Sequence, residues 1–292
     1  MLHLFHASSE QCSRVVTEKY STSFASAIQL LHKDLRAPIC NIYGFVRFAD
    51  EIVDSFHDFD KPTLLREFRQ ETFEAIRRGI SLNPILNSFQ LTVNQYEIDH
   101  ALIEAFFGSM EMDLTCQSYS AGEYNEYIYG SAETVGLMCL TVFCEGRMET
   151  MEKLRTSARS LGAAFQKVNF LRDIRSDYTG LSRLYFPCCD FNNFRDEDKK
   201  QIEADIQKDF RAAYKGIIHL PLKARFGVYV AYKYYFSLFR KIRRLQPSKM
   251  MEKRIRIPNY HKLFIFLRAG IKNQFRLIAP QQSDLSNAGP GL

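Results

Sequence analysis

Residues 41–56 read NIYGFVRFADEIVDSF, and this stretch decides the fold class. Asp50 and Asp54 are four residues apart, so on a helix both carboxylates project from one face. Arg47 and Tyr43 continue that face towards the N-terminus. The positions between them are largely apolar, which predicts a helix that is buried nearly all round. Carboxylates in such a helix are costly unless they are paired or bound to a cation.

A second stretch, LGAAFQKVNFLRDIRSDY at residues 161–178, repeats this arrangement. Its polar positions follow at helical spacing: Gln166, Asn169, Asp173 and Asp177. A row of oxygen ligands therefore lies on one face of another apolar helix, with Arg172 beside it as a group for an anion. The carboxylates of a single row are commonly paired with arginine or act as helix caps. Two rows favour Mg²⁺, which takes few carboxylates and completes its shell with water and substrate phosphates.

The rest of the chain favours an all-α protein. It has 292 residues, of which 46% are hydrophobic and 25% charged, a balance that excludes disordered and fibrous classes. No proline lies between Pro84 and Pro187, and apolar residues recur there at helical period. Hairpin turns of the Asn-Gly or Asp-Gly type are absent from the sequence. The phosphate-binding loop and the glycine-rich dinucleotide motif are also absent, which excludes those two nucleotide-binding classes.

Apolar periodicity predicts nine helices, over residues 10–33, 38–56, 62–79, 95–115, 122–145, 150–178, 196–214, 221–245 and 258–275. Pro38, Pro62 and Pro221 are each placed in the first turn of a helix. Linkers rich in Gly, Ser or Pro are absent, so residues 1–278 are expected to form a single domain. The polar stretch 279–292 is expected to be a disordered tail.

Charge and cysteine content indicate the surroundings of the protein. The net charge of +6 is too small to imply a nucleic-acid partner, but Phe236–Arg276 holds 12 Lys or Arg and one acidic residue. This segment is either a solvated basic face or a surface for anionic substrates or anionic lipid. Seven cysteines without zinc-ligand spacing indicate reduced thiols. The N-terminus lacks a signal-peptide pattern, and the apolar run Glu133–Glu145 is too short to span a membrane. We therefore expect a cytoplasmic protein that associates peripherally with the inner face of the membrane.

Five segments together resemble a known family. They are KYSTSF at 19–24, YGFVRFADEIVD at 43–54, YIYGSAETVG at 127–136, LGAAFQKVNFLRDIRSD at 161–177 and RLYFP at 183–187. Their order and spacing resemble the squalene/phytoene synthases, which are all-α, head-to-head prenyltransferases. The resemblance covers about residues 15 to 275 and implies a single-domain isoprenoid synthase bundle of helices around a central cavity. In many family members an acidic residue stands at Ser176 and a glycine at Ser182, and neither departure removes a metal ligand.

The resemblance also implies roles for particular residues. Mg²⁺, or Mn²⁺ as an alternative, would bridge to diphosphate from Asp50, Asp54, Asp173 and Asp177, with Asn169 assisting. The substrate diphosphates would be bound by Ser21, Ser23, Arg47, Gln166, Asn169, Arg172, Tyr235 and Arg254. Tyr43, Tyr129 and Tyr185 would line the cavity near the reacting carbons and act in catalysis with Arg47 and Arg172. Without the resemblance, the two serines read as a helix N-terminal cap.

The activity implied is that of a phytoene synthase. Such an enzyme joins two geranylgeranyl diphosphates through prephytoene diphosphate to phytoene, releasing diphosphate without NADPH. Small residues at 25–27 and 162–164 leave room for the longer substrate, although they also allow close helix packing. A squalene or dehydrosqualene synthase that uses farnesyl diphosphate is the alternative. Two further alternatives are a non-catalytic assembly factor, which would have lost aspartates, and a class I terpene cyclase, which would leave the YSTSF segment unexplained.

Overall fold

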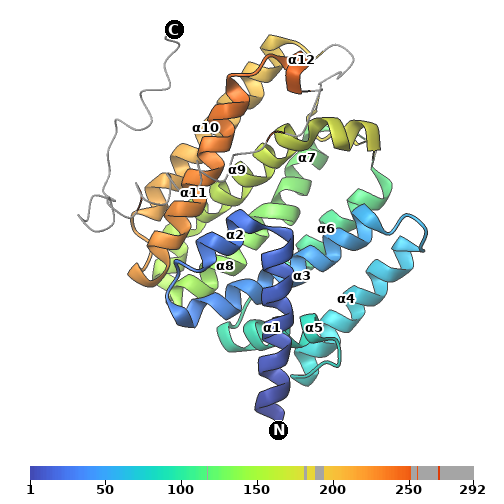
Figure 1. Cartoon of the computed structure of the whole chain (residues 1–292), viewed down its shortest axis with the longest axis vertical. Coiled ribbons are helices and arrows are strands. Elements are labelled where there is room, and N and C mark those ends of the chain that lie inside the picture. Colours follow the sequence, from blue (N-terminus) through green and yellow to red (C-terminus); the bar gives the residue numbers. More distant parts are fainter. Residues whose placement is uncertain (117, 181–182, 188–193, 251–254, 256–268, 270–292) are drawn as a thin grey trace.

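The chain forms a bundle of α-helices, with α4 and α5 on one side and α10 and α11 on the other (Figure 1). The structure is a computed structural model that describes residues 1–116, 118–180, 183–187, 194–250, 255 and 269, without the side chains of 176–180 and 248. The helices are α1 (Leu2–Tyr20), α2 (Thr22–Ile28), α3 (Lys33–Ser55), α4 (Lys61–Arg78), α5 (Pro84–Tyr96), α6 (His100–Thr115), α7 (Ala121–Ile128), the π-helix η1 (Tyr129–Glu133), α8 (Thr134–Cys144), α9 (Met148–Gly180), α10 (Asp196–Ile217), α11 (Leu222–Arg243) and α12 (Pro247–Met250). Within the described ranges the one extended pairing is an isolated bridge between Ser118 and Leu184. The all-α prediction is confirmed.

Side-chain caps set several helix starts. Asp60 accepts a hydrogen bond from the backbone N–H of Thr63 at 3.1 Å, and Pro62 lies in the first turn of α4 as predicted. Ser120 and Glu123 form a reciprocal capping box at the start of α7. Pro221 directly precedes α11 as its N-cap and does not lie within the first turn.

The predicted helix over residues 10–33 is wrong, because the structure contains α1, α2 and the start of α3 there. Ser21 has extended backbone angles and its hydroxyl accepts a hydrogen bond from the Phe24 N–H at 3.2 Å, so it ends α1 and caps α2. Pro38 lies inside α3, because that helix begins at Lys33. Its missing N–H removes a single hydrogen bond near the start of the helix.

The sequence analysis missed α5, and α6 begins five residues later than predicted. Asn83 caps α5 and Pro84 occupies its first position, while Glu97 ends it in the left-handed conformation with φ 52°. The helices predicted at 150–178, 196–214 and 221–245 are confirmed as α9, α10 and α11. The helix predicted at 258–275 and the tail 279–292 lie outside the described residues.

Stacked aromatic rings form the core beside the first aspartate row. Phe45 of α3 lies parallel to Phe89 of α5 with ring centroids 3.9 Å apart, and it also contacts Phe68, Phe106 and Phe107. All five rings are buried. Offset and edge-to-face ring contacts of this kind add to the hydrophobic burial and fix α3 against α4, α5 and α6. The aspartate row on α3 therefore projects from a rigid helix.

The helical stretch Ala121–Cys144 joins α7, η1 and α8, and its length and composition would allow it to cross a membrane. It is longer than the apolar run that the sequence analysis considered. Within the structure, 67% of its most apolar window is buried, which is typical of a core helix. Cys12, Cys40, Cys116, Cys139 and Cys144 are free thiols, as predicted; Cys188 and Cys189 lie outside the described residues.

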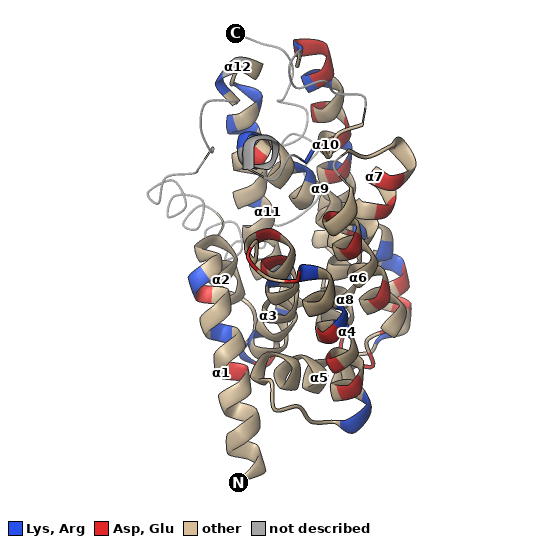
Figure 2. Cartoon of the chain, turned by 90° about the vertical axis from the view of Figure 1, so that its right-hand side faces the viewer, with Lys and Arg blue, Asp and Glu red and all other residues tan. Residues whose placement is uncertain are grey.

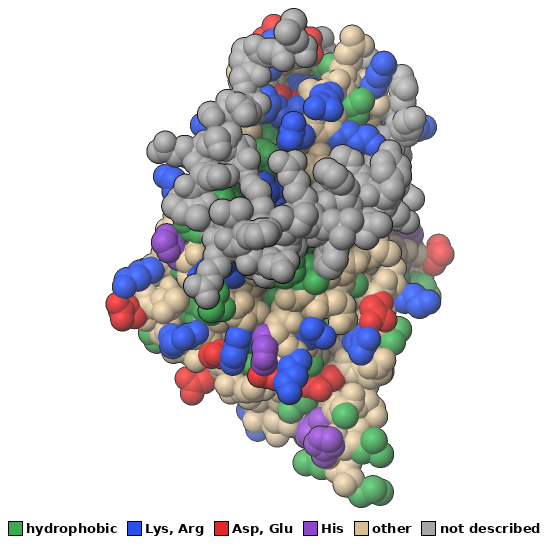
Figure 3. All heavy atoms as spheres, turned by 60° about the vertical axis from the view of Figure 1, so that its left-hand side comes forward, with side chains coloured by type: hydrophobic (Ala, Val, Ile, Leu, Met, Phe, Trp, Pro, Cys, Tyr) green, Lys and Arg blue, Asp and Glu red, His purple; other side chains and the backbone are tan. Residues whose placement is uncertain are grey.

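Charge is unevenly distributed over the bundle (Figure 2). Acidic residues occupy the first turn of α10, whereas basic residues occupy the last turn of α11 and α12. Lys and Arg side chains also gather towards the upper end of the face seen in Figure 3. Most of the basic segment 236–276 lies outside the described residues, so its contact with anionic lipid stays a prediction.

Candidate active site

A cavity of about 390 Å³ lies between α2, α3, α8, α9, α10 and α11. Most of its wall is apolar, and includes Phe24, Ala27, Ile28, Leu31, Ile39, Val46, Val135, Cys139, Leu140, Phe143, Leu154, Leu161, Phe165, Ile217, Leu220 and Val228. Small residues complete the wall at Ala132, Gly136, Ala158 and Gly162. The bundle therefore encloses space for a hydrocarbon chain, as the resemblance predicts.

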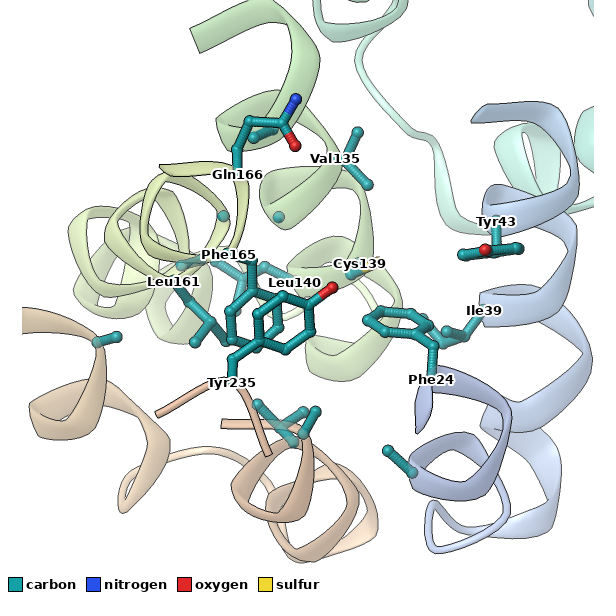
Figure 4. A pocket seen from close by; sticks show the side chains of 18 of the residues that line it. Phe24, Ile39, Tyr43, Val135, Cys139, Leu140, Leu161, Phe165, Gln166 and Tyr235 are labelled. Atoms are coloured by element: carbon teal, nitrogen blue, oxygen red, sulfur yellow. The ribbon is translucent and has the colours of Figure 1, made fainter. Parts of the chain in front are cut away.

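Two pairs of aromatic rings face the cavity from opposite walls (Figure 4). Tyr235 of α11 lies parallel to Phe165 of α9 with centroids 3.9 Å apart. Phe24 of α2 and Tyr43 of α3 stack at 5.5 Å. Burial raises the pKa of Tyr43 to about 12, so its hydroxyl stays protonated at neutral pH. The ring faces offer a negative electrostatic surface to any cation in the cavity.

Along α3 and α9 the lining changes from apolar to polar. On α3, Ile39 is followed by Tyr43, Arg47 and Asp50, one helical turn apart. On α9, Leu161 and Phe165 are followed by the polar residues Gln166, Asn169 and Arg172. The two rows recognised in the sequence thus reach one cavity, although more than 110 residues separate them, while Asp54 and Asp173 are not among its lining residues.

Two buried polar atoms in these rows have no hydrogen-bond partner: the side-chain Oδ1 of Asn169 and the Nε of Arg47. Leaving a buried donor or acceptor unpaired costs about 1–3 kcal/mol. The Asn169 oxygen can accept from a donor or bind a cation, and the Arg47 nitrogen can donate to an anion. The site therefore lacks both a positive and a negative partner, as a site for a metal–diphosphate pair would.

An arginine lies beside one aspartate of each row. Arg172 Nη2 lies 2.5 Å from Asp173 Oδ2, and Arg47 Nη1 lies 3.9 Å from Asp50 Oδ2. Arg47 also forms an ion pair with Glu51. Asp173 is therefore closely paired with the arginine of its row, whereas Asp50 has only a long contact with Arg47.

Asp50 has a raised pKa. Its pKa is raised to about 7, chiefly because the surrounding protein removes the carboxylate from water. The negative charge of Asp54 also raises the pKa, and this effect is larger than the lowering by Arg47. A pKa this high means that the ionised carboxylate lacks sufficient positive charge nearby. A bound cation would supply that charge.

The structure places the other predicted residues as follows. Ser21 and Tyr235 line the cavity, whereas Ser23, Tyr129 and Tyr185 are not among its lining residues. The Tyr129 ring lies 5.3 Å from the guanidinium of Arg159. Arg254 and the side chain of Asp177 lie outside the described part of the chain.

The sequence analysis missed a buried network next to the first row. Arg183 Nη1 lies 2.8 Å from Asp54 Oδ1 and 3.4 Å from Asp113 Oδ1, and it donates to the Tyr185 hydroxyl at 3.2 Å. Tyr127 donates to Asp113 Oδ2 at 2.7 Å. Arg183, Tyr185 and Tyr127 lie in segments that carry the family resemblance, but nothing in the sequence linked them to Asp113 of α6.

Among the described residues, no three His, Cys, Asp or Glu side chains form a ready-made metal cluster. The oxygens present are few carboxylates and one unpaired amide. This donor set fits a hard cation that takes its remaining ligands from water and phosphate, and does not fit a soft transition metal.

Comparison with known proteins agrees with this geometry. A sequence model of the family described as squalene/phytoene synthase matches residues 17–261. The chain is 25% identical over 280 residues to the phytoene synthase of Arthrospira platensis, covering 87% of this chain and 90% of that relative. It is 29% identical over 170 residues to the presqualene diphosphate synthase of Rhodopseudomonas palustris, covering 57% of this chain and 58% of that relative.

A solved structure has the same fold. The crystal structure of a dehydrosqualene synthase in complex with ligand superimposes with a TM-score of 0.78 at 17% identity, covering 92% of this chain and 98% of that chain. The predicted isoprenoid synthase bundle is thereby confirmed as the architecture.

Proposed function

Since this chain belongs to the squalene/phytoene synthase family of prenyltransferases, we propose that it is a phytoene synthase. It joins two geranylgeranyl diphosphates head to head and releases diphosphate, without NADPH. The observation that carries the proposal is the pair of unpartnered buried atoms, Asn169 Oδ1 and Arg47 Nε, on the lining of an apolar cavity. One suits a metal cation and the other suits the diphosphate that the metal would bridge.

Mg²⁺ would be held by Asp50, Asp54, Asp173 and Asn169, and by Asp177 on the same face of α9. When bound, such a metal neutralises the negative charge that builds up on a leaving diphosphate. The observed donor set supports this assignment, because its oxygen atoms are the ligand type that Mg²⁺ prefers.

Arg47 and Arg172 would exchange their aspartate partners for the substrate diphosphate. Each now holds a carboxylate of its own row, and each lines the cavity. With a cation held by those carboxylates, the guanidinium groups would be free to turn their N–H donors to the diphosphate oxygens, where bidentate contact is strong. Arg47 already has the Nε donor unused.

The apolar walls have the complementary task. Phe24, Tyr43, Phe165 and Tyr235 surround the prenyl chains and exclude water, which would otherwise quench a carbocation. Their ring faces stabilise positive charge, because the quadrupole of each ring is negative on its face. Holding the second chain against the reactive carbon converts the joining step into an effectively unimolecular one.

The choice of the twenty-carbon substrate is supported by small residues in the wall and by the relatives. Ala132, Gly136, Ala158 and Gly162 line the cavity without filling it. The phytoene synthase of Arthrospira platensis matches nearly the whole chain. A 4,4′-diapophytoene synthase of Staphylococcus haemolyticus, 23% identical over 202 residues, keeps the fifteen-carbon substrate as the second candidate.

The deciding test is a product assay. Purified protein with Mg²⁺ and geranylgeranyl diphosphate should form phytoene without NADPH, and EDTA should stop the reaction. Turnover of farnesyl diphosphate alone would reject the substrate assignment, and absence of hydrocarbon from both substrates would reject the enzyme. Asp50→Asn should abolish turnover, whereas Glu149→Gln, which changes an exposed carboxylate paired with Lys153, should not alter it.

A further inference from the structure

Arg183 joins three separate parts of the fold. Its side chain is 6% exposed, and it follows the long helix α9 in sequence. Nη1 contacts the Asp54 carboxylate at 2.8 Å, and Nη2 donates to the backbone carbonyl oxygens of Val53 at 3.3 Å and Asp113 at 2.9 Å. The guanidinium therefore joins the segment after α9 to the last turn of α3 and to α6.

Asp113 holds this guanidinium in place. Its side chain is 3% exposed, and its carboxylate accepts from the hydroxyls of Tyr119 at 3.2 Å, Tyr127 at 2.7 Å and Tyr185 at 3.3 Å. Both carboxylate oxygens are engaged within the protein. A buried carboxylate satisfied in this way serves as a fixed counter-charge and is not free to take a metal.

Asp54 needs such support, because it lies in the last turn of α3. The C-terminal end of a helix carries partial negative charge from its carbonyl groups, which repels a carboxylate there. Arg183 neutralises Asp54 and also binds the Val53 carbonyl, which accepts from Lys61 Nζ as well at 2.9 Å. Without the guanidinium, the negative charge of Asp54 would destabilise the last turn of α3.

We propose that Arg183, held by Asp113, is a positioning residue for the metal site, an inference that rests on the proposed function. It binds Oδ1 of Asp54 and leaves Oδ2 without a protein partner in the described structure. It keeps that carboxylate one helical turn from Asp50, so that the two act on one cation. Its role is thus unlike that of Arg47 and Arg172, which line the cavity and can reach diphosphate.

The test compares metal binding in matched variants. Arg183→Lys keeps the charge and loses the forked geometry that spans Asp54, Val53 and Asp113. Asn87→Ala removes a buried hydrogen bond to Ser9 at 2.9 Å that joins α5 to α1, and Asn87 belongs neither to the Arg183 network nor to the cavity lining. Binding of Mn²⁺ is followed by electron paramagnetic resonance in the presence of inorganic diphosphate, and the Mg²⁺ concentration for half-maximal activity is measured in parallel. Circular dichroism verifies folding of each protein.

We expect Arg183→Lys to weaken Mn²⁺ binding about tenfold and to raise the half-activating Mg²⁺ concentration by a similar factor. Asp113→Asn, which keeps the shape of the side chain, should shift both values in the same direction and serves if Arg183→Lys does not fold. Asn87→Ala should lower the melting temperature and leave both metal values unchanged.

Wild-type metal binding in Arg183→Lys would overturn the inference, as would equal weakening in Asn87→Ala, which would assign the effect to general loosening. If the wild-type protein bound Mn²⁺ but formed no hydrocarbon, the proposed function would fail and the binding comparison would still decide the role of Arg183. If the wild-type protein bound no Mn²⁺, both proposals would fall.

Discussion

Gly162→Ala tests whether close contact between α9 and η1 sets the position of the second row. A Cβ added at Gly162 would lie 2.3 Å from the carbonyl oxygen of Ala132, 2.8 Å from its carbonyl carbon and 3.2 Å from Glu133 Cα. These are backbone atoms, so no side chain can rotate out of the way. For an ordinary contact, α9 and η1 must separate by about 1 Å.

The cost follows from two opposing effects. Overpacking a buried contact costs about 3 kcal/mol at the upper end of the usual range, and the immobile backbone justifies that end. Replacing glycine by alanine within a helix returns about 1 kcal/mol through better helix propensity. The free energy of unfolding should therefore fall by about 2 kcal/mol, which lowers the melting temperature by about 5 °C in a domain of this size.

Gly108→Ala is the matched control. Gly108 is exposed on α6, and no atom lies within 4 Å of the position that its Cβ would take. This variant should be stabilised by about 0.5–1 kcal/mol. Urea unfolding monitored by circular dichroism measures both, and equal stability of the two variants would refute the reasoning. Turnover should fall about 100-fold in Gly162→Ala alone, because Gln166 and Asn169 follow on the displaced helix and small shifts of catalytic groups are costly.

Two further predictions concern α9. Asn169→Ala should lower hydrocarbon formation about 10–100-fold, since its Oδ1 is a proposed metal ligand. The unfolding free energy should change by less than about 1 kcal/mol, because that atom has no protein partner. Unchanged turnover would argue against the ligand role. Lys167→Met should lower the unfolding free energy by about 3–5 kcal/mol at pH 7, because Lys167, 10% exposed, pairs with Asp209 at 2.7 Å and with Asp205. Although burial opposes its charge, Asp209 and Asp205 raise the pKa of Lys167 above 10.5, so its contribution is present below pH 10.5 and is lost as the pH rises through the raised value. A stability difference between wild type and Lys167→Met that stays constant from pH 7 to pH 12 would contradict this.

Local spacing was enough to predict the two polar rows. Steps of three and four on an apolar helix are determined within one element, and α3 and α9 are long helices that keep one face in one direction. The same logic predicted α9, α10 and α11. It failed at residues 10–33, where the apolar pattern continues across Ser21 but the Ser21 hydroxyl caps a new helix.

The Arg183 network could not be derived in this way, because it depends on contacts across the fold. Arg183 pairs with Asp54 across 129 residues of sequence, and its hydrogen bond to the Asp113 carbonyl spans 70. No periodicity within one helix connects such positions. Tyr185 shows the same limit: the family resemblance implied a place in the cavity wall, whereas its ring stacks on Phe170 at 3.9 Å and its hydroxyl donates to Asp113.

The arrangement along α3 and α9 separates two properties that a prenyltransferase must adjust independently. Each helix contributes apolar side chains to the cavity wall, such as Ile39 and Leu161, and polar side chains further along, such as Asp50 and Asn169. A change of volume at the apolar positions alters the space for the hydrocarbon chain while leaving the charges around the diphosphate in place. The rigid helices keep the two ends in register, because each is one continuous element. On the proposed function, substrate length changes by substitution of apolar residues, whereas the aspartates and arginines must stay.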